Sequence, residues 1–147
     1  MRDLRVKTLI VVAALALGLG TLACNAIEAR PQAESIAEAM FEARRTRGSE
    51  AALVHYHPSF FESTGRRQWV AMLDDAEANL GALQSHTLQE SEVVEETEGV
   101  DFPVGTYVTL AFETRYARAT ATEKVTVLFA PGQEPGIVNH RMTPQHP

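Results

Sequence analysis

The spacing of the apolar residues changes at Gly81, and this change constrains the fold more than any other feature of the sequence. Before Gly81 the apolar residues recur every three or four positions, which is the period of a helix. After Gly81 they alternate with polar residues, which is the period of a strand. Helices followed by antiparallel strands make an α+β fold. The sequence therefore predicts about three N-terminal helices packed on a curved, four-stranded antiparallel sheet.

The first predicted helix begins at Pro31, a favoured first-turn residue, and ends at Gly48. Its apolar stripe consists of Ala33, Ile36, Ala37, Met40 and Phe41. Three cations fill the last turn, where they are expected to oppose the helix dipole: Arg44, Arg45 and Arg47. A shorter helix is expected after Ser49, which resembles an N-cap.

A third helix is expected from a cap at Ser63 or Thr64 to Gly81. Its stripe consists of Trp69, Leu73, Ala76 and Leu80. Strands are then expected over 83–94, 106–116, 119–130 and 137–142, with an acidic turn region over 95–101. In the second strand one face carries Val108, Leu110, Phe112 and Tyr116, and the other carries Tyr107, Thr109, Glu113 and Arg115. In the third, Ala121, Val125, Val127 and Phe129 alternate with Thr120, Thr122, Lys124, Thr126 and Leu128.

The N-terminal segment has the layout of a bacterial export signal, with a basic start, an apolar core and small residues before Cys24. Cys24 is the only cysteine of the chain. The segment resembles a lipobox, so we expect residues 1–23 to be a signal peptide and Cys24 to carry the lipid. Two alternatives remain open: secretion after cleavage behind Ala23, and retention of residues 8–27 as a membrane helix.

Lipidation at Cys24 would place the protein in the cell envelope, anchored in a membrane by acyl chains such as palmitate and facing the periplasm. Asn25 follows the cysteine, where aspartate favours retention in the inner membrane, so the outer membrane is expected. Residues 24–31 are expected to form the lipidated N-terminus and a short tether. A single domain over 32–143 and a disordered tail over 144–147 complete the predicted organisation.

Charge excludes one class of partner. Loss of the signal removes three basic residues and one acidic residue, and the net charge changes from −6 to −8. Such a domain is repelled by phosphate backbones, so nucleic acid is not an expected partner. A single cysteine permits no internal disulfide, and the hydrophobic core must supply the stability.

The order of elements resembles a bacterial family catalogued as domain of unknown function 4019. The residues that carry the resemblance are Arg47-Gly48, Trp69, Leu80-Gly81-Ala82-Leu83, Gly105-Thr106-Tyr107-Val108-Thr109-Leu110-Ala111-Phe112 and Glu123-Lys124-Val125-Thr126-Val127. The resemblance covers most of residues 32–142 and implies a small exported protein with no assigned activity. The Trp and the Gly-Tyr pair usual in the last strand of that family are missing from residues 135–141. The element order is also similar, more loosely, to the cystatin-like (nuclear-transport-factor-2-like) cone fold.

Two arrangements of histidines are candidate sites. His55 and His57 have the spacing for zinc on an extended segment, but no third or fourth ligand follows at a fixed spacing, so loop polarity explains them better. Asp74 or Asp75 with His86 or His140 is a candidate acid–base pair, although a solvated helix face is the more frequent outcome for such aspartates. No metal and no cofactor is therefore expected.

Other candidate sites have simpler explanations. The four serines Ser59, Ser63, Ser85 and Ser91 lack a nucleophile motif. The acidic run of Glu90, Glu92, Glu95, Glu96, Glu98 and Asp101 lacks the spacing of a calcium loop. The aromatic residues Phe60, Phe61, Trp69, Tyr107, Phe112, Tyr116 and Phe129 have core spacing, although they are also suited to lining an apolar pocket.

The sequence thus predicts a lipid-anchored envelope protein that acts as a non-catalytic binding or interaction module near the membrane. The sheet face with Tyr107, Thr109 and Arg115, together with the edge strand, would be presented to an envelope protein or glycan. The alternative is a cone-fold binder of a small apolar molecule, or an acid–base enzyme with a His/Asp pocket. No catalytic residue is assigned in either case.

Overall fold

The computed structural model describes residues 27–145. Helix covers residues 27–47, and the sheet is reached through three further short or medium helices and one 3₁₀ turn. These elements are α2 (Ser49–Ala52), η1 (Leu53–His55), α3 (Phe60–Ser63) and α4 (Arg66–Leu80). The strands are β1 (Leu83–Glu96), β2 (Gly105–Tyr116), β3 (Thr120–Phe129) and β4 (Gly136–Gln145). The predicted α+β class is confirmed, with four α-helices instead of about three.

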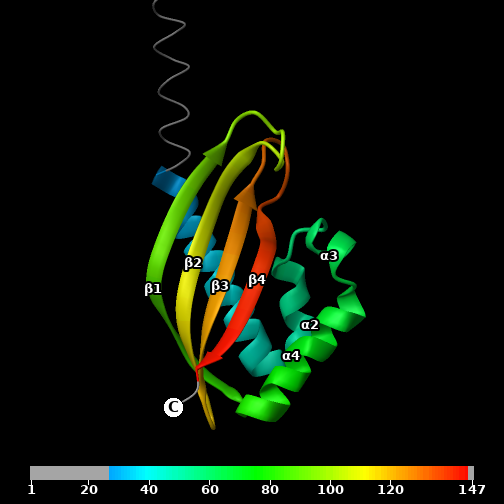
Figure 1. Cartoon of the computed structure of the whole chain (residues 1–147), viewed down its shortest axis with the longest axis vertical. Helices are drawn as coiled ribbons and strands as arrows, with labels where there is room; N and C mark the ends of the chain where they lie inside the picture. The colour runs from blue at the N-terminus through cyan, green and yellow to red at the C-terminus, as the bar shows by residue number, and fades with distance from the viewer. Residues whose placement is uncertain (1–26, 146–147) are drawn as a thin grey trace, which may run out of the picture.

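The four strands form one open antiparallel sheet in the order β1-β2-β3-β4. The helix over 27–47 lies behind the sheet in Figure 1, and α2, α3 and α4 lie beside the β4 edge. No helix of the described chain crosses the opposite face of the sheet, which is turned toward the viewer. The sheet therefore has one covered face and one open face.

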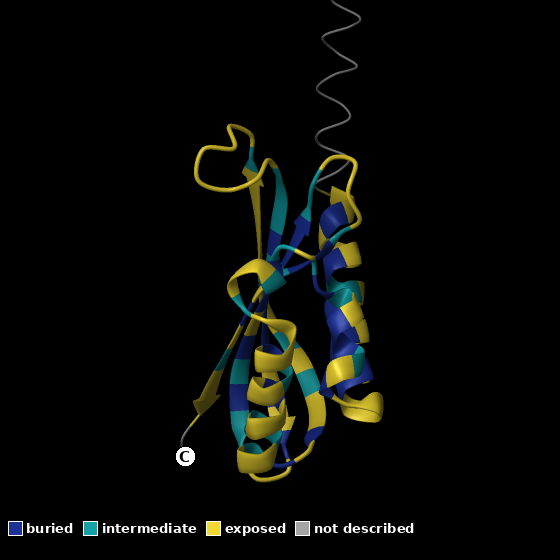
Figure 2. Ribbon diagram, turned by 90° about the vertical axis from the view of Figure 1, so that its right-hand side faces the viewer, coloured by how far each residue is buried: buried dark blue, intermediate teal, exposed yellow. Residues whose placement is uncertain are grey.

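The core lies between the long helix and the covered face. The predicted stripe supplies Ala33, Ala37, Met40 and Phe41, all with no exposed surface, although Ile36 is only partly buried. From the sheet, Val108 and Leu110 of β2 and Val125 and Val127 of β3 are likewise fully buried. Figure 2 shows this buried side of the long helix turned toward the strands. The alternation predicted for β2 is confirmed.

A bulge in β4 brings His140 to the core. Thr126 pairs with Asn139 and Val127 pairs with Ile137, so one extra residue, Val138, is inserted into β4. A bulge re-aims the side chains that follow it. As a result Ile137 and His140 are both buried although they are three positions apart.

The ends of two elements differ from the predictions. Residues 27–30 are already helical, so the helix does not begin at Pro31 and the predicted tether over 24–31 is wrong for residues 27–31. β4 continues to Gln145, so Pro144 and Gln145 belong to the sheet and not to a disordered tail. The predicted signal peptide, Cys24 and residues 146–147 lie outside the described residues.

The short elements before α4 also differ in detail. Gly48 is the N-cap of α2, and Ser49 is its first buried residue instead of its cap. Gly65 precedes α4 as its N-cap in place of Ser63 or Thr64. Within α4, Trp69 and Leu73 are buried as expected, and Gly81 ends the helix. None of the helices in the described part is both long and apolar enough to cross a membrane.

Candidate functional site

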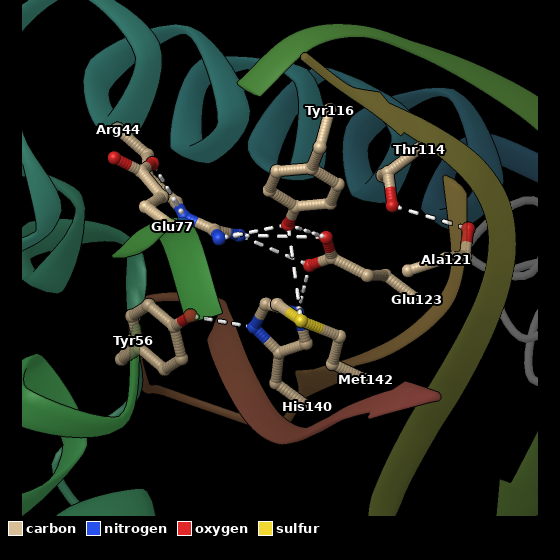
Figure 3. A network of polar contacts seen from close by, with 9 residues as sticks. All are labelled: Arg44, Tyr56, Glu77, Thr114, Tyr116, Ala121, Glu123, His140 and Met142. Atoms are coloured by element: carbon tan, nitrogen blue, oxygen red, sulfur yellow. Dashed lines mark hydrogen bonds and ion pairs between the residues drawn. The ribbon is translucent and has the colours of Figure 1, made fainter. Parts of the chain in front are cut away.

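A network of polar side chains is buried between the long helix and the sheet, as Figure 3 shows. Arg44 comes from the helix, Glu123 from β3 and His140 from β4, and their exposed fractions are 1%, 0% and 5%. Charged side chains are rarely buried to this extent unless they are paired. This network is therefore the most unusual chemical feature of the described chain.

Glu123 is the centre of the network. Arg44 donates from Nη1 to Oε2 of Glu123 over 3.2 Å and from Nη2 to the hydroxyl of Tyr116 over 2.8 Å. Tyr116 in turn donates its hydroxyl to Oε1 of Glu123. A further ion pair joins Arg44 Nε to Oε1 of Glu77 over 3.4 Å, without the geometry of a hydrogen bond. Through Glu77, which is 30% exposed at its side chain, the network extends to the surface of α4.

His140 occupies the other side of Glu123. Its Nε2 lies 2.7 Å from Oε2 of Glu123, and its Nδ1 lies 2.7 Å from the hydroxyl of Tyr56. A neutral imidazole with its proton on Nε2 satisfies both contacts, because it donates to the carboxylate and accepts from Tyr56. The ring is enclosed by Trp69 and Phe41, whose centroids lie 5.3 Å and 6.4 Å from its own.

The network keeps Glu123 ionised. Burial opposes ionisation, but the hydrogen bond from His140, the charge of Arg44 and the hydrogen bond from Tyr116 together lower the pKa of Glu123 to about 2. Burial lowers the pKa of Arg44, yet the charges of Glu123 and Glu77 and the contact with Tyr116 together outweigh this, and the net pKa is raised. Burial raises the pKa of Tyr116 and of Tyr56 well above the usual value. One carboxylate and one guanidinium thus balance each other in the core.

The two main hollows of the described chain do not open onto this network. One open groove of about 360 Å³ lies between the start of the long helix and the ends of the two hairpins. A second hollow of about 280 Å³ lies on the open face of the sheet, between β1, β2 and β3. Neither is lined by Arg44, Glu123 or His140. The groups that could exchange protons are bonded to one another, and neither hollow leads to them.

Sequence reasoning missed Arg44 and Glu123. Arg44 lies in the last turn of the long helix, as predicted, but its side chain is fully buried and paired with Glu123, which the pattern of cations does not predict. Its position, four residues after Met40 and seven after Ala37, continues the apolar stripe. Glu123 lies two residues after Ala121 and two before Val125, on the inward side of the β3 alternation. The sequence carries a signal for both residues, because each is a charged residue at a position where the apolar period predicts a buried side chain.

The predicted His/Asp pair is not formed. Asp74 and Asp75 are exposed on α4. His86 stacks on Phe41 with ring centroids 4.6 Å apart, and burial lowers its pKa. His140 is buried as an acid–base group would be, but its partner is Glu123.

The histidine pair before Pro58 is explained by loop contacts. His57 bonds Ser59 through Nδ1 over 2.7 Å and Gln133 through Nε2 over 2.9 Å. Burial lowers the pKa of His55. Within residues 27–145 no three His, Cys, Asp or Glu side chains are grouped so that they could hold a metal ion.

Most of the aromatic residues belong to the core. Phe60, Trp69, Phe112 and Tyr116 are buried, whereas Phe61, Tyr107 and Phe129 are partly buried. The acidic run contributes the last residues of β1 and a turn: Glu96 accepts bonds from the backbone N–H groups of Glu98 and Gly99. This run therefore closes the β1–β2 hairpin.

β1 is an edge strand of 14 residues, and it pairs with β2 alone. An edge strand presents backbone N–H and C=O groups that no strand of its own sheet satisfies. Glu90, Glu92 and Glu95 are exposed along it. The open face beside it carries the hydroxyl pair of Thr109 and Thr126, 2.9 Å apart. The described chain thus offers a long, acidic edge next to an uncovered, largely polar sheet face.

A sequence model of one family, described as Protein of unknown function (DUF4019), matches residues 37–134. No curated protein and no solved structure matches the chain. The matched segment begins within the long helix and ends before β4. It therefore includes Arg44 and Glu123 but not His140.

Proposed function

The chain belongs to the DUF4019 family, and we propose that it is a lipid-anchored protein of the bacterial envelope that binds a partner protein along the β1 edge. The proposal has two parts, which are the anchor at Cys24 and the binding edge. The observation that carries the binding part is the unpaired outer edge of β1, which extends over 14 residues beside the uncovered sheet face.

The edge favours an extended, basic segment as its ligand. Peptides that add a strand to a sheet gain affinity from main-chain hydrogen bonds and specificity from alternate side chains. Glu90, Glu92 and Glu95 give this edge a negative charge, in keeping with the net charge of −8 expected after loss of the signal. A basic segment is attracted by this charge, whereas a second acidic edge is repelled. The partner is therefore a protein with a cationic, extended stretch.

The anchor rests on the signal layout and on the position of Cys24 as the only cysteine. Acyl chains on its sulfur and on the new amino terminus would hold the domain on the periplasmic side of a membrane. Asn25 behind the cysteine favours the outer membrane over the inner one. One acyl chain gives only marginal membrane binding, so more than one chain is needed for a stable anchor.

Radiolabelled palmitate tests the anchor. The wild-type chain should incorporate the label and sediment with the envelope membranes, whereas the Cys24→Ser variant should incorporate none and be recovered in the soluble fraction. A wild-type chain without label would overturn the anchor and leave plain secretion as the explanation.

Site-specific photo-crosslinking in intact envelopes tests the binding edge. A photoreactive residue at Glu92 on β1 should give a discrete protein adduct. The same residue at Asp75, which is exposed on α4, is the matched control and should not. The double variant Glu90→Lys/Glu92→Lys should lose the adduct formed by a probe at neighbouring Glu95. Equal labelling at positions 92 and 75 would contradict the proposal.

A second candidate function is acid–base chemistry on a small molecule, and the contact between Glu123 and His140 favours it. It requires a conformation in which a substrate reaches His140, which lines neither hollow of the described residues. The ring N–H proton signal of His140 in a ¹⁵N-labelled sample would detect such an opening, because exchange with water would broaden this signal. A sharp, slowly exchanging signal would count against this function.

A further inference from the structure

Exposed apolar side chains gather at one end of the molecule. Eight large hydrophobic residues of the described chain are exposed, and six of them lie at the end where the long helix starts and the β1–β2 hairpin turns: Ile27, Val93, Val94, Val100, Phe102 and Val104. We call these six the apolar end surface. Ile27 and Val100 are each more than 70% exposed, and Phe102 is 63% exposed. Figures 1 and 2 both show the hairpin turn and the start of the helix at the same end.

The hairpin presents these residues on an ordered turn. Glu96 holds the backbone of Glu98 and Gly99 through its carboxylate, and Tyr107 donates its hydroxyl to the carbonyl of Pro103 over 2.8 Å. Phe102 lies against Tyr107, with ring centroids 6.3 Å apart. These contacts hold the turn in the conformation that leaves Phe102 exposed.

The apolar character continues into the groove behind the turn. The apolar part of its lining is Ala29 of the long helix, Val104 beside β2, Phe129 at the end of β3 and Pro131 after it, and its rim also carries Glu28, Glu95 and Glu96. Exposed apolar side chains gathered at one end of a soluble domain mark an interaction site. The position of the region in the chain identifies its partner.

Ile27 is three residues after Cys24. Three residues span at most about 11 Å when fully extended. If Cys24 carries lipid at the bilayer surface, this reach keeps Ile27 in or just above the headgroup region, which is about 5–8 Å thick on each side of the hydrocarbon core. Of all surfaces of the described domain, this end is the one brought to the membrane by the anchor.

We propose that the apolar end surface is a second membrane contact. Phe102 and Val100 insert among zwitterionic lipid headgroups, and the domain stands on its hairpin end with its long axis pointing away from the bilayer. This inference rests on the proposed anchor at Cys24. The neighbouring carboxylates of Glu95, Glu98 and Asp101 are exposed, and they repel anionic headgroups. The surface therefore selects a bilayer of low charge. With its hairpin end on the lipid, the domain presents the β1 edge sideways to a partner.

The chain supplies its own labelling strategy. In the lipidated protein the Cys24 sulfur is blocked, so a cysteine introduced elsewhere is the only free thiol. The variant Phe102→Cys carries an environment-sensitive fluorophore on the apolar end surface. The matched control Asn79→Cys carries it on an exposed residue near the end of α4, at the opposite end of the molecule. Val100→Cys is a second probe of the same surface, in case the Phe102 change disturbs the turn.

The experiment uses the full lipidated chain in vesicles of phosphatidylethanolamine and phosphatidylcholine. Flotation with the vesicles reports the anchor, and acrylamide quenching reports the surface. Quenching at positions 102 and 100 should fall several-fold relative to position 79, and the protection should weaken as phosphatidylglycerol is added and return at high salt. Flotation with equal quenching at all three positions would overturn the membrane contact and leave the anchor intact. Failure to float would overturn the anchor, and the membrane contact with it.

Discussion

At the scale of single residues, the molecule is defined by the ion pair between Arg44 and Glu123. Both side chains are fully removed from water, and each is satisfied mainly by the other and by Tyr116. Replacing such a pair by apolar residues is often neutral, whereas removing one partner leaves an uncompensated buried charge. The network consequently makes the core depend on the exact chemistry of one glutamate.

Neutralising Glu123 should therefore destabilise the fold strongly. We expect Glu123→Gln to lower the free energy of unfolding by about 3–5 kcal/mol, because Arg44 loses its counter-charge inside the core. Urea denaturation followed by circular dichroism measures the change. Glu113→Gln, an exposed glutamate on the open face of β2, is the matched control and should stay within about 0.5 kcal/mol of the wild type. Equal effects of the two changes would contradict a stabilising role of the buried pair.

Acid should remove the contribution that ionised Glu123 makes to the free energy of unfolding. The pKa of Glu123 is about 2 in the folded chain against an ordinary value of 4.5, so the unfolded chain binds a proton that the folded chain does not. The stabilisation is complete above about pH 4.5 and is lost as the pH falls toward 2, with a slope of up to about 1.4 kcal/mol per pH unit from this one group. Urea midpoints between pH 5 and pH 2 measure it.

The variant Tyr116→Phe tests the origin of that slope. It keeps the carboxylate but removes one donor that lowers the pKa of Glu123. The acid-induced loss should then be smaller in total and should end at a higher pH than in the wild type. An unchanged acid profile would show that Tyr116 does not hold the charge of Glu123.

At the scale of elements, the end of α4 is completed by a hairpin turn. The carbonyl of Leu80 accepts the N–H of Arg118, and the carbonyl of Ala82 accepts the N–H of Ala117. The first of these bonds satisfies a carbonyl that the end of the helix leaves without a helical partner. Gly81 allows this contact because it has φ +90° and because a Cβ there would lie 2.7 Å from the Cβ of Ala117.

A comparison of two glycines separates the cost of the backbone conformation from the cost of a steric contact. Gly48 has a similar φ of +94°, but a Cβ there would meet nothing within 4 Å. Both glycines combine a positive φ with an extended ψ, a conformation that costs alanine about 1–3 kcal/mol at either position. We expect Gly81→Ala to cost about 1–3 kcal/mol more than Gly48→Ala, because it also overpacks the turn. Chemical denaturation of both variants measures the difference, and equal losses would mean that the β2–β3 turn yields freely.

Much of the fold was predictable, because the periods of the apolar residues are clear. Val108, Leu110 and Phe112 face the core as their alternation requires, and Gly81 ends α4. The centre of the network was not predictable in the same way. An apolar pattern does not predict that Arg44 and Glu123 are buried. Each can be buried only because the other, 79 positions away in the sequence, neutralises its charge. His140 became an inward residue only through the bulge at Val138.

At the scale of the whole molecule, the folded unit does not depend on the proposed anchor. Every buried residue of the described chain lies between Ala29 and His140. We therefore expect the soluble form of Cys24→Ser, once its signal has been removed, to unfold at the same urea concentration as the detergent-solubilised wild type. Tryptophan fluorescence of the buried Trp69 reports the transition. A clearly lower midpoint for the variant would show that lipidation also stabilises the domain.

The acidic edge of β1 has a further consequence for a protein that is held on a surface. Anchored copies diffuse in two dimensions and meet one another far more often than the same number of copies dissolved in a compartment. A 14-residue edge without a partner strand would invite two such copies to join their sheets. Like charges that face each other across such a junction oppose it, and Glu90, Glu92 and Glu95 would stand against their counterparts. In the anchored protein that we propose, the glutamates would thereby keep neighbouring copies dispersed, with each edge free.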